Sequence, residues 1–391
     1  MMVQHDSNAG KAKKSNLFLR LLALLVTAAL VLGALVLVVY RDRFNLDALV
    51  RWLAYRDLET SDTGEAAPFT HAGGDRMSIA YLDGGILTAS VAGAHYYSLS
   101  GEPYVEEVLP LENPVLTASE SAGVVYDAGG QSLFAFRDGS EYFQLTLEGG
   151  GDLLSARVNG RGWLTVTAQQ SGYRGAVTVY DTEGQPVIQI SLSSTFVVDA
   201  ALSPDCRTVA VVTMGQEGGS FYSRLLFYPV DEKEPEAQVD LGNTAVLDLD
   251  YEDGLVWVLG SDRLVTATPD GSAVQTYALG RNYLKGASLA GEGFALLLTG
   301  RYQAGGATQA LIVGPEGELT QTMELSGQTL GLSAAGGYCA LLTGSELAIY
   351  TRELAPYATL STTQGARLVS LSPNGSALLA NDEQAWLYIP D

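Results

Sequence analysis

The chain has 391 residues, with 44 acidic and 22 basic side chains and a formal net charge of −22 at pH 7. Such a negative field repels nucleic acids and anionic lipid headgroups, which argues against both as partners. The three histidines and two cysteines exclude most zinc sites and most pairs of a nucleophile with a histidine base.

A basic tail, residues 1–16, precedes a 24-residue apolar run, residues 17–40, in which Arg20 is the one charged side chain. At about 1.5 Å per residue, a helix of this length crosses a hydrocarbon core of roughly 30 Å. The alternative is a cleaved signal peptide, but a cut near Ala28 or Ala29 would leave residues 30–40 apolar and exposed. The sequence therefore predicts a single-pass transmembrane helix that is not cleaved.

The orientation of this span does not follow from the positive-inside rule, because equal numbers of basic residues flank its two ends. Residues 1–57 carry 8 basic and 4 acidic groups, and the remainder of the chain carries 14 basic and 40 acidic groups. A short basic tail, one span and a long acidic domain are typical of a signal anchor. We expect a cytoplasmic N-terminus and an extracytoplasmic domain at the cell membrane.

Residues 41–59 predict a juxtamembrane amphipathic helix with Asn45 as its cap. Its apolar stripe consists of Leu46, Leu49, Val50 and Leu53, with Trp52 and Tyr55 beside it. Two interpretations stay open: the helix lies on the membrane surface, or it continues the transmembrane helix beyond the headgroups. Residues 60–64 are polar and predict a short linker.

From residue 65 to residue 391 the sequence indicates an all-β domain, because one phrase returns about every forty residues. The phrase is a hydrophobic strand, a turn of Gly or Pro with acidic neighbours, and another alternating strand. It occurs at residues 97–104, 136–139, 180–184, 228–231, 268–271, 314–317, 350–353 and 388–391. This period predicts a β-propeller of four-stranded blades.

The last phrase lacks a following strand, since the sequence stops at Asp391. Residues 65–71, just before the first full unit, are placed to supply that strand and to close the ring. Seven complete units between about 75 and 364, three strands from 365 to 391 and the strand at 65–71 give eight blades. Seven blades is the alternative, because repeat boundaries in one sequence can slip.

Two of the turns, residues 202–206 and 371–375, match a turn of WD40 and TolB propellers, in which Pro presets one dihedral angle and Gly or Asn accepts a positive φ. Cys206 stands where the glycine is expected. The Gly-His and Trp-Asp pairs of WD40 repeats are absent. The chain is therefore WD40-like in architecture only.

Residues 248–254 suggest a calcium loop, since acidic residues alternate before a glycine, but the spacing differs and the distant bidentate glutamate is missing. Strand alternation explains the same pattern without a metal. We therefore expect Leu247, Leu249 and Tyr251 to point into a blade, with the acidic residues facing solvent or the axial channel.

The other candidate catalytic or ligand-binding residues are weakly supported. The segments around Ser288 and Ser333 resemble a nucleophile elbow but lack its second glycine and a later histidine. His95, beside Tyr96 and Tyr97, is expected to be a partly buried strand residue rather than a ligand-binding one.

The two cysteines, Cys206 and Cys339, lie three units apart and are expected to be unpaired. The quinoprotein docking repeat and the Ser-x-Asp-x-Gly-x-Thr-Trp boxes of glycan-cleaving propellers are absent. We expect no catalytic, cofactor-binding or metal-binding residues, and no enzyme.

Several segments together carry a resemblance: the basic tail and span, residues 46–55, the closing strand at 67–71 and the blade turns. On these the chain resembles an uncharacterised clostridial family of membrane-anchored, WD40- or quinoprotein-like β-propeller proteins, known as a domain of unknown function. The resemblance implies a cell-surface location in a single-membrane bacterium. It supplies no catalytic residues.

Two functions are consistent with this sequence. The first is a non-enzymatic recognition or scaffold module that holds a protein or cell-envelope ligand near the membrane. The alternative is a propeller enzyme that acts on an envelope glycan or a small molecule at the central funnel. Fold alone does not decide between them.

Overall fold

The computed structural model describes residues 22, 24–27 and 46–390, apart from residues 108, 150 and 253. The chain divides into two units, residues 1–50 and residues 51–391. The predicted span at 17–40 lies outside the described residues except for residues 22 and 24–27, which are helical, and the predicted cap Asn45 also lies outside them. Within the described part, no helix has both the length and the apolar character needed to cross a membrane.

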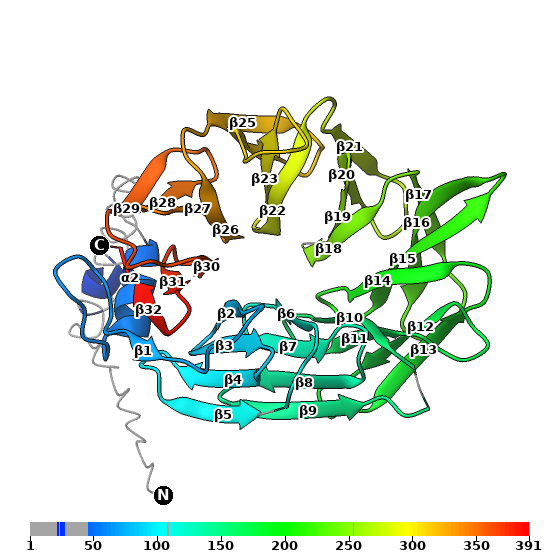
Figure 1. Cartoon of the computed structure of the whole chain (residues 1–391), viewed down its shortest axis with the longest axis horizontal. Coiled ribbons are helices and arrows are strands. Elements are labelled where there is room, and N and C mark those ends of the chain that lie inside the picture. The colour runs from blue at the N-terminus through cyan, green and yellow to red at the C-terminus, as the bar shows by residue number, and fades with distance from the viewer. Residues whose placement is uncertain are drawn as a thin grey trace, which may run out of the picture. The chain divides into compact units, whose positions relative to one another are not determined.

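Residues 69–388 form eight antiparallel sheets of four strands each, arranged as a ring (Figure 1). The predicted eight-bladed propeller is therefore confirmed. The strands, blade by blade, are β2–β5 (Ser78–Leu82, Gly85–Ser90, Gly93–Ser98, Pro103–Glu107); β6–β9 (Pro114–Ala118, Ala122–Asp127, Ser132–Arg137, Ser140–Thr146); β10–β13 (Leu153–Val158, Leu164–Ala168, Gly175–Tyr180, Pro186–Leu192); β14–β17 (Phe196–Leu202, Thr208–Glu217, Ser220–Pro229, Ala237–Gly242); β18–β21 (Val246–Glu252, Leu255–Gly260, Arg263–Ala267, Val274–Ala278); β22–β25 (Tyr283–Gly291, Phe294–Gly300, Gln309–Val313, Leu319–Glu324); β26–β29 (Thr329–Ala335, Tyr338–Thr343, Leu347–Thr351, Pro356–Leu360); and β30–β32 with β1 (Leu368–Leu371, Ala377–Ala380, Gln384–Tyr388, Phe69–Thr70). We number the blades one to eight in this order.

Blade eight is completed from the N-terminal side, as predicted. The short strand β1 pairs with β32, with Phe69 opposite Ala385 and Thr70 opposite Gln384. The pairing continues on both sides of β1. Before it, Ala66 N donates to Leu387 O at 2.8 Å and Ile389 N donates to Gly64 O at 2.8 Å; after it, His71 N donates to Glu383 O at 3.2 Å. The ring is thus closed by both ends of the propeller sequence.

The antiparallel order of each blade places its loops on two opposite faces. Loops that join the first to the second strand and the third to the fourth strand lie on one face, which we call the helix face. Loops that join the second to the third strand, and one blade to the next, lie on the other, which we call the far face. The repeated turns of the sequence join third to fourth strands, and so belong to the helix face.

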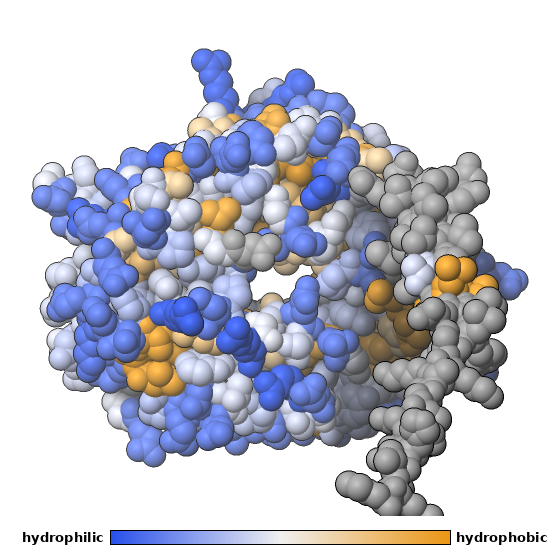
Figure 2. Space-filling view, turned by 180° about the vertical axis from the view of Figure 1, so that it is seen from behind, coloured by the Kyte–Doolittle hydropathy of each residue, from blue (hydrophilic) through white to orange (hydrophobic). Residues whose placement is uncertain are grey.

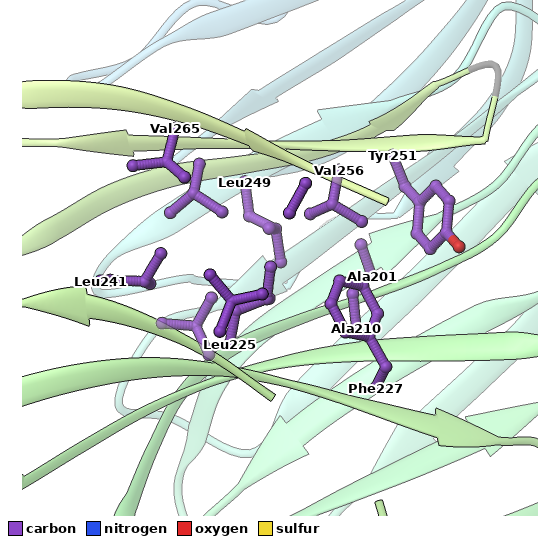
Figure 3. Packing of buried hydrophobic residues seen from close by; sticks show 13 residues of the cluster. Ala201, Ala210, Leu225, Phe227, Leu241, Leu249, Tyr251, Val256 and Val265 are labelled. Carbon is purple, nitrogen blue, oxygen red and sulfur yellow. The ribbon is translucent and has the colours of Figure 1, made fainter. Parts of the chain in front are cut away.

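The core lies between neighbouring blades, because a four-stranded sheet cannot bury its two faces alone. Between blades four and five, Leu225 and Phe227 pack with Leu249 and Val256 (Figure 3). Similar buried clusters fill the other seven interfaces. Aliphatic and aromatic side chains from facing sheets therefore hold adjacent blades together.

Serine hydroxyls add links between the innermost strands of blades six, seven, eight and one. Ser288 Oγ accepts from Ala334 N at 3.0 Å, Ser333 Oγ from Leu371 N at 2.9 Å and Ser370 Oγ from Tyr81 N at 3.1 Å. These bonds satisfy backbone N–H groups that do not pair with a neighbouring strand of the same blade. They assign Ser288 and Ser333 a structural role.

The two WD40-like turns have the predicted backbone. Gly375 has a φ of 85°, and Cys206, at the matching position, has a φ of 63°. A residue with a Cβ is disfavoured in this left-handed region. The side chain of Asn159 donates to Cys206 Sγ at 3.1 Å and so contacts the turn.

Helix α2 (Leu46–Tyr55) ends against the helix face of the ring. Arg51 is 2% exposed and donates to Asn374 O at 2.6 Å, in the first loop of blade eight. The guanidinium also lies 5.7 Å from the centre of the Tyr357 ring. Tyr55 is 5% exposed and donates to Tyr81 Oη at 3.1 Å. Arg51 and Tyr55 thus fix the end of α2 on blades seven, eight and one.

Candidate functional site

The centre of the ring is open, as Figure 2 shows on one face. On its wall, Arg157 of β10 donates to Asp199 Oδ2 of β14 at 2.6 Å and to Asp248 Oδ1 of β18 at 2.7 Å. A second bond, from Arg157 Nε to the same Asp199 oxygen, measures 2.9 Å. One cation therefore joins the innermost strands of three blades.

The two carboxylates are themselves held in place. Asp199 Oδ1 accepts from Ala200 N at 2.8 Å, and Asp248 Oδ1 accepts from Leu249 N at 2.9 Å. Burial disfavours the charged guanidinium, but the two carboxylates outweigh it and raise the pKa of Arg157 above its ordinary value. The triad is a charge-assisted network in which Nε and Nη2 of Arg157 are already engaged by carboxylates.

Asp250, two residues further along β18, is the exception. It lines a cavity of about 120 Å³ on the helix-face side of the funnel, together with Arg157 and Tyr251. Burial raises the pKa of its carboxyl to about 6, although Arg157 and a hydrogen bond from Tyr251 N act in the opposite direction. Asp250 therefore takes up a proton at a higher pH than an ordinary aspartate does.

We expect the substitution Asp250→Asn to stabilise the protein at pH 7.5. Between about pH 4 and pH 6 the folded state binds more protons than the unfolded state, so the free energy of unfolding falls as pH rises. A shift of about two pKa units corresponds to about 3 kcal/mol at most, and we expect about 2 kcal/mol. Urea unfolding of Asp250→Asn and of the unsubstituted protein at pH 4.5 and 7.5 measures the difference in unfolding free energy. At pH 4.5 the difference is expected to shrink to about a third, because the unfolded-state carboxyl is still largely ionised there, and Asp231→Asn, on an exposed loop, serves as the control. Equal stability of Asp250→Asn and the unsubstituted protein at pH 7.5 would rule the effect out.

The alternating strand β18 is partly as predicted. Leu249 and Tyr251 are buried, but the prediction that Leu247 points into the blade was wrong, since its side chain is 58% exposed. The cause is a β-bulge between Val246 and Asp248, which shifts the register against β19. Among the described residues, no group of three His, Cys, Asp or Glu side chains is arranged to hold a metal ion.

His95 was expected to be partly buried on an alternating strand, and this was wrong, because every residue of β4 is buried. The ring of His95 stacks on Tyr97 at 6.2 Å, and burial lowers its pKa. His71 Nε2 lies 3.0 Å from Asn381 O, at the closing strand. Both histidines pack within blades rather than facing the funnel.

The cysteines are unpaired, as predicted. Cys206 lies in the first turn of blade four and Cys339 in the second strand of blade seven. Burial raises the pKa of the Cys339 thiol to about 12. This thiol therefore behaves as a small buried hydrophobe.

A larger cavity, of about 230 Å³, lies between blades six and seven on the helix face. Its charged lining includes Arg352 and Glu353, which pair with each other at 3.0 Å. That exposed ion pair contributes little stability. The cavity contains no group of titratable side chains comparable to that in the funnel.

Comparison with known proteins identifies the fold and a family. The chain is similar to AztD from Citrobacter koseri (12% identity, TM-score 0.53, covering 77% of this chain and 90% of that one) and to a eukaryotic initiation factor (13%, 0.50, 81% and 84%). It is also similar to BamB from Moraxella catarrhalis (15%, 0.48, 82% and 98%). No curated protein sequence matches the chain. Residues 57–353 match the family model described as "Family of unknown function (DUF5711)", and the chain belongs to this family.

Proposed function

We propose that the protein is a non-enzymatic recognition or scaffold module, anchored in the cell membrane with its propeller outside, that holds a protein or a cell-envelope ligand. Arg157 carries this conclusion. Its Nε and Nη2 atoms are engaged by Asp199 and Asp248, so these funnel charges serve to join three blades of the ring. A ligand would therefore meet mainly the outer surface and its loops, where propellers present variable surface.

Helix α2 supports the anchored arrangement. Leu49, Val50, Trp52 and Leu53 are each at least 50% exposed, whereas Arg51 and Tyr55 are buried against the ring. An apolar stripe of this kind, a few residues after an apolar run long enough to span a bilayer, is suited to the lipid interface.

A second candidate is an enzyme that uses the funnel, and Asp250 favours it. A carboxyl with a pKa of about 6 in a cavity is a recognised mark of a catalytic site. The cavity of about 120 Å³ is, however, well below the roughly 300–1,000 Å³ of ordinary ligand pockets. We therefore rank catalysis second.

Cross-linking in intact producing cells tests the recognition function. The full chain, extracted from membranes washed at high salt, is expected to yield the same envelope protein in repeated preparations, identified by mass spectrometry. Asp250→Asn should leave the yield unchanged, because no catalytic step is involved. Recovery of the chain from the soluble fraction would contradict the anchor. Loss of the partner in Asp250→Asn would favour the funnel instead.

A further inference from the structure

Charge is distributed unequally between the two faces of blades three to six. The far-face loops between residues 169 and 328 contain three arginines, Arg174, Arg281 and Arg301, and one acidic residue, Asp262. In the described helix-face loops of the same blades, three basic residues stand against eleven acidic ones: Asp181, Glu183, Asp205, Asp231, Glu232, Glu234, Glu236, Asp270, Glu292, Glu316 and Glu318. The far face of these blades is therefore the less acidic side of a strongly acidic ring.

In the described part of the chain, the cations of this surface do not form ion pairs, although three exposed carboxylates, Glu217, Asp240 and Glu324, lie at the strand ends beside the far-face loops. Asp262 is already paired with Arg263, at 2.8 Å. Among the described residues, the ion pairs do not include Arg174, Arg224, Arg281, Lys285 or Arg301. Instead, the Arg174 guanidinium lies 4.7 Å from the Phe196 ring and that of Arg224 lies 4.2 Å from the Tyr222 ring. Such stacked guanidinium groups keep their donors available to an anion.

Exposed apolar side chains gather on the same surface. In blades three to six, seven of the ten exposed large hydrophobic residues lie in far-face loops or at the strand ends beside them. They are Tyr173, Phe196, Met214, Phe221, Leu247, Tyr283 and Tyr302. The other three, Val187, Val274 and Leu319, stand singly at the beginnings of outer strands. Apolar groups collected among cations mark an interaction surface.

Blade four provides the centre of this surface. Its middle strands β15 and β16, green in Figure 1, are ten residues long, whereas the middle strands of the other blades have four to seven residues. Gly218 and Gly219, both with positive φ, close the hairpin as a two-residue turn. The extension is fully paired up to Glu217 opposite Ser220, so it is an ordered projection.

The register places three apolar side chains on one side of this projection. Phe196 pairs with Met214, and Gln216 pairs with Phe221. Directly paired residues share a side of the sheet, as do residues two apart on one strand. Phe196, Met214 and Phe221 therefore form one exposed row, with Arg174 against its first member.

We propose that the far face of blades three to six, centred on the β15–β16 hairpin, binds an acidic polypeptide segment that carries large apolar side chains. Carboxylates of the segment would pair with Arg174, Arg281 and Arg301, and its apolar side chains would pack on the row formed by Phe196, Met214 and Phe221. The acidic helix face would repel the same segment. This inference rests on the proposed recognition function and specifies its surface and the chemistry of its partner.

Selection from a display library of random peptides of about 12 residues, on the full chain in detergent, tests this assignment. The enriched peptides are expected to combine Asp or Glu with Phe, Leu or Trp. Phe221→Ser and Arg174→Glu should each weaken their binding about tenfold or more. Raising the salt concentration from about 0.05 M to about 0.5 M should weaken it further, because exposed charges are screened.

Matched controls are Val187→Ser, at an exposed apolar position on an outer strand, and Arg207→Glu, on a helix-face loop. Neither should change binding, and all four variants should keep their thermal midpoints.

Enrichment of basic peptides, or equal losses of peptide binding in the controls, would overturn the inference. Self-association of the chain that Phe221→Ser abolishes would also overturn it, since the occupant would then be a second copy. If cells yield a partner that cross-links only to the helix face, this inference fails while the recognition function stands; if no partner is found, the function itself fails.

Discussion

Replacing residues 65–71 by a Gly-Ser segment of the same length is expected to lower the thermal midpoint by roughly 5–10 °C. The change removes the ladder between β1 and β32 and the packing of the Phe69 ring against Tyr97 at 5.2 Å. About 5 kcal/mol of hydrogen bonding and apolar burial would be lost. For a ring of this size, each kcal/mol corresponds to about 1.5 °C. Differential scanning calorimetry of the full chain measures the shift.

The matched control replaces residues 301–307, an exposed far-face loop segment, in the same way, and is expected to leave the midpoint within about 1 °C because few buried contacts are lost. A synthetic peptide of residues 60–72, added in excess, should restore part of the loss by pairing with the free edge of β32. A midpoint unaffected by the replacement would show that the closing strand does not hold the ring together.

Arg157→Met is expected to cost about 3–5 kcal/mol of unfolding free energy. The substitution leaves Asp199, whose side chain is 12% exposed, beside Asp248 without a compensating cation. Breaking one partner of a buried ion pair is expensive because the remaining charge stays desolvated. Urea unfolding at pH 7 gives the value, and the loss should shrink at about pH 4, where carboxylates begin to take up protons.

The double variant Arg157→Met with Asp199→Asn separates the ion pair from simple packing. It should be more stable than Arg157→Met alone, because the uncompensated charge is removed. Arg207→Met, an exposed arginine outside the described ion pairs, should change stability by less than about 0.5 kcal/mol. Equal losses for the Arg157 and Arg207 variants would show that the triad contributes nothing particular.

The repeat period was sufficient to predict the ring, its eight blades and the closing strand. It succeeded because seven of the eight turn phrases, all but the one at residues 350–353, contain Gly, Pro or Asp. Asp138 and Gly139 show why these residues fit, with φ of 51° and 73°. The unpaired cysteines followed from the same repeat count. A turn pattern that recurs eight times at a regular spacing is compatible with few topologies other than a ring of eight similar blades.

The funnel triad was not predicted. Arg157 is a lone charged residue in the strand Leu153–Val158, and this was the available signal, but its partners lie 42 and 91 residues away. Leu247 was placed wrongly because a bulge changes which side chains face the core without changing the sequence pattern. The row formed by Phe196, Met214 and Phe221 depends on cross-strand register, which periodicity alone does not fix.

The contacts of Arg51 and Tyr55 with the ring have a mechanical consequence. Tension applied to the chain ahead of α2 would first reach Arg51, which is bonded to Asn374, and Tyr55, which is bonded to Tyr81. Only after these contacts broke would the force reach residues 64–70, whose backbone pairs with β32 and with Ile389. The contacts of Arg51 and Tyr55 would therefore protect the pairing that closes blade eight. Pulling from the N-terminal side would detach the end of α2 before it opened that blade.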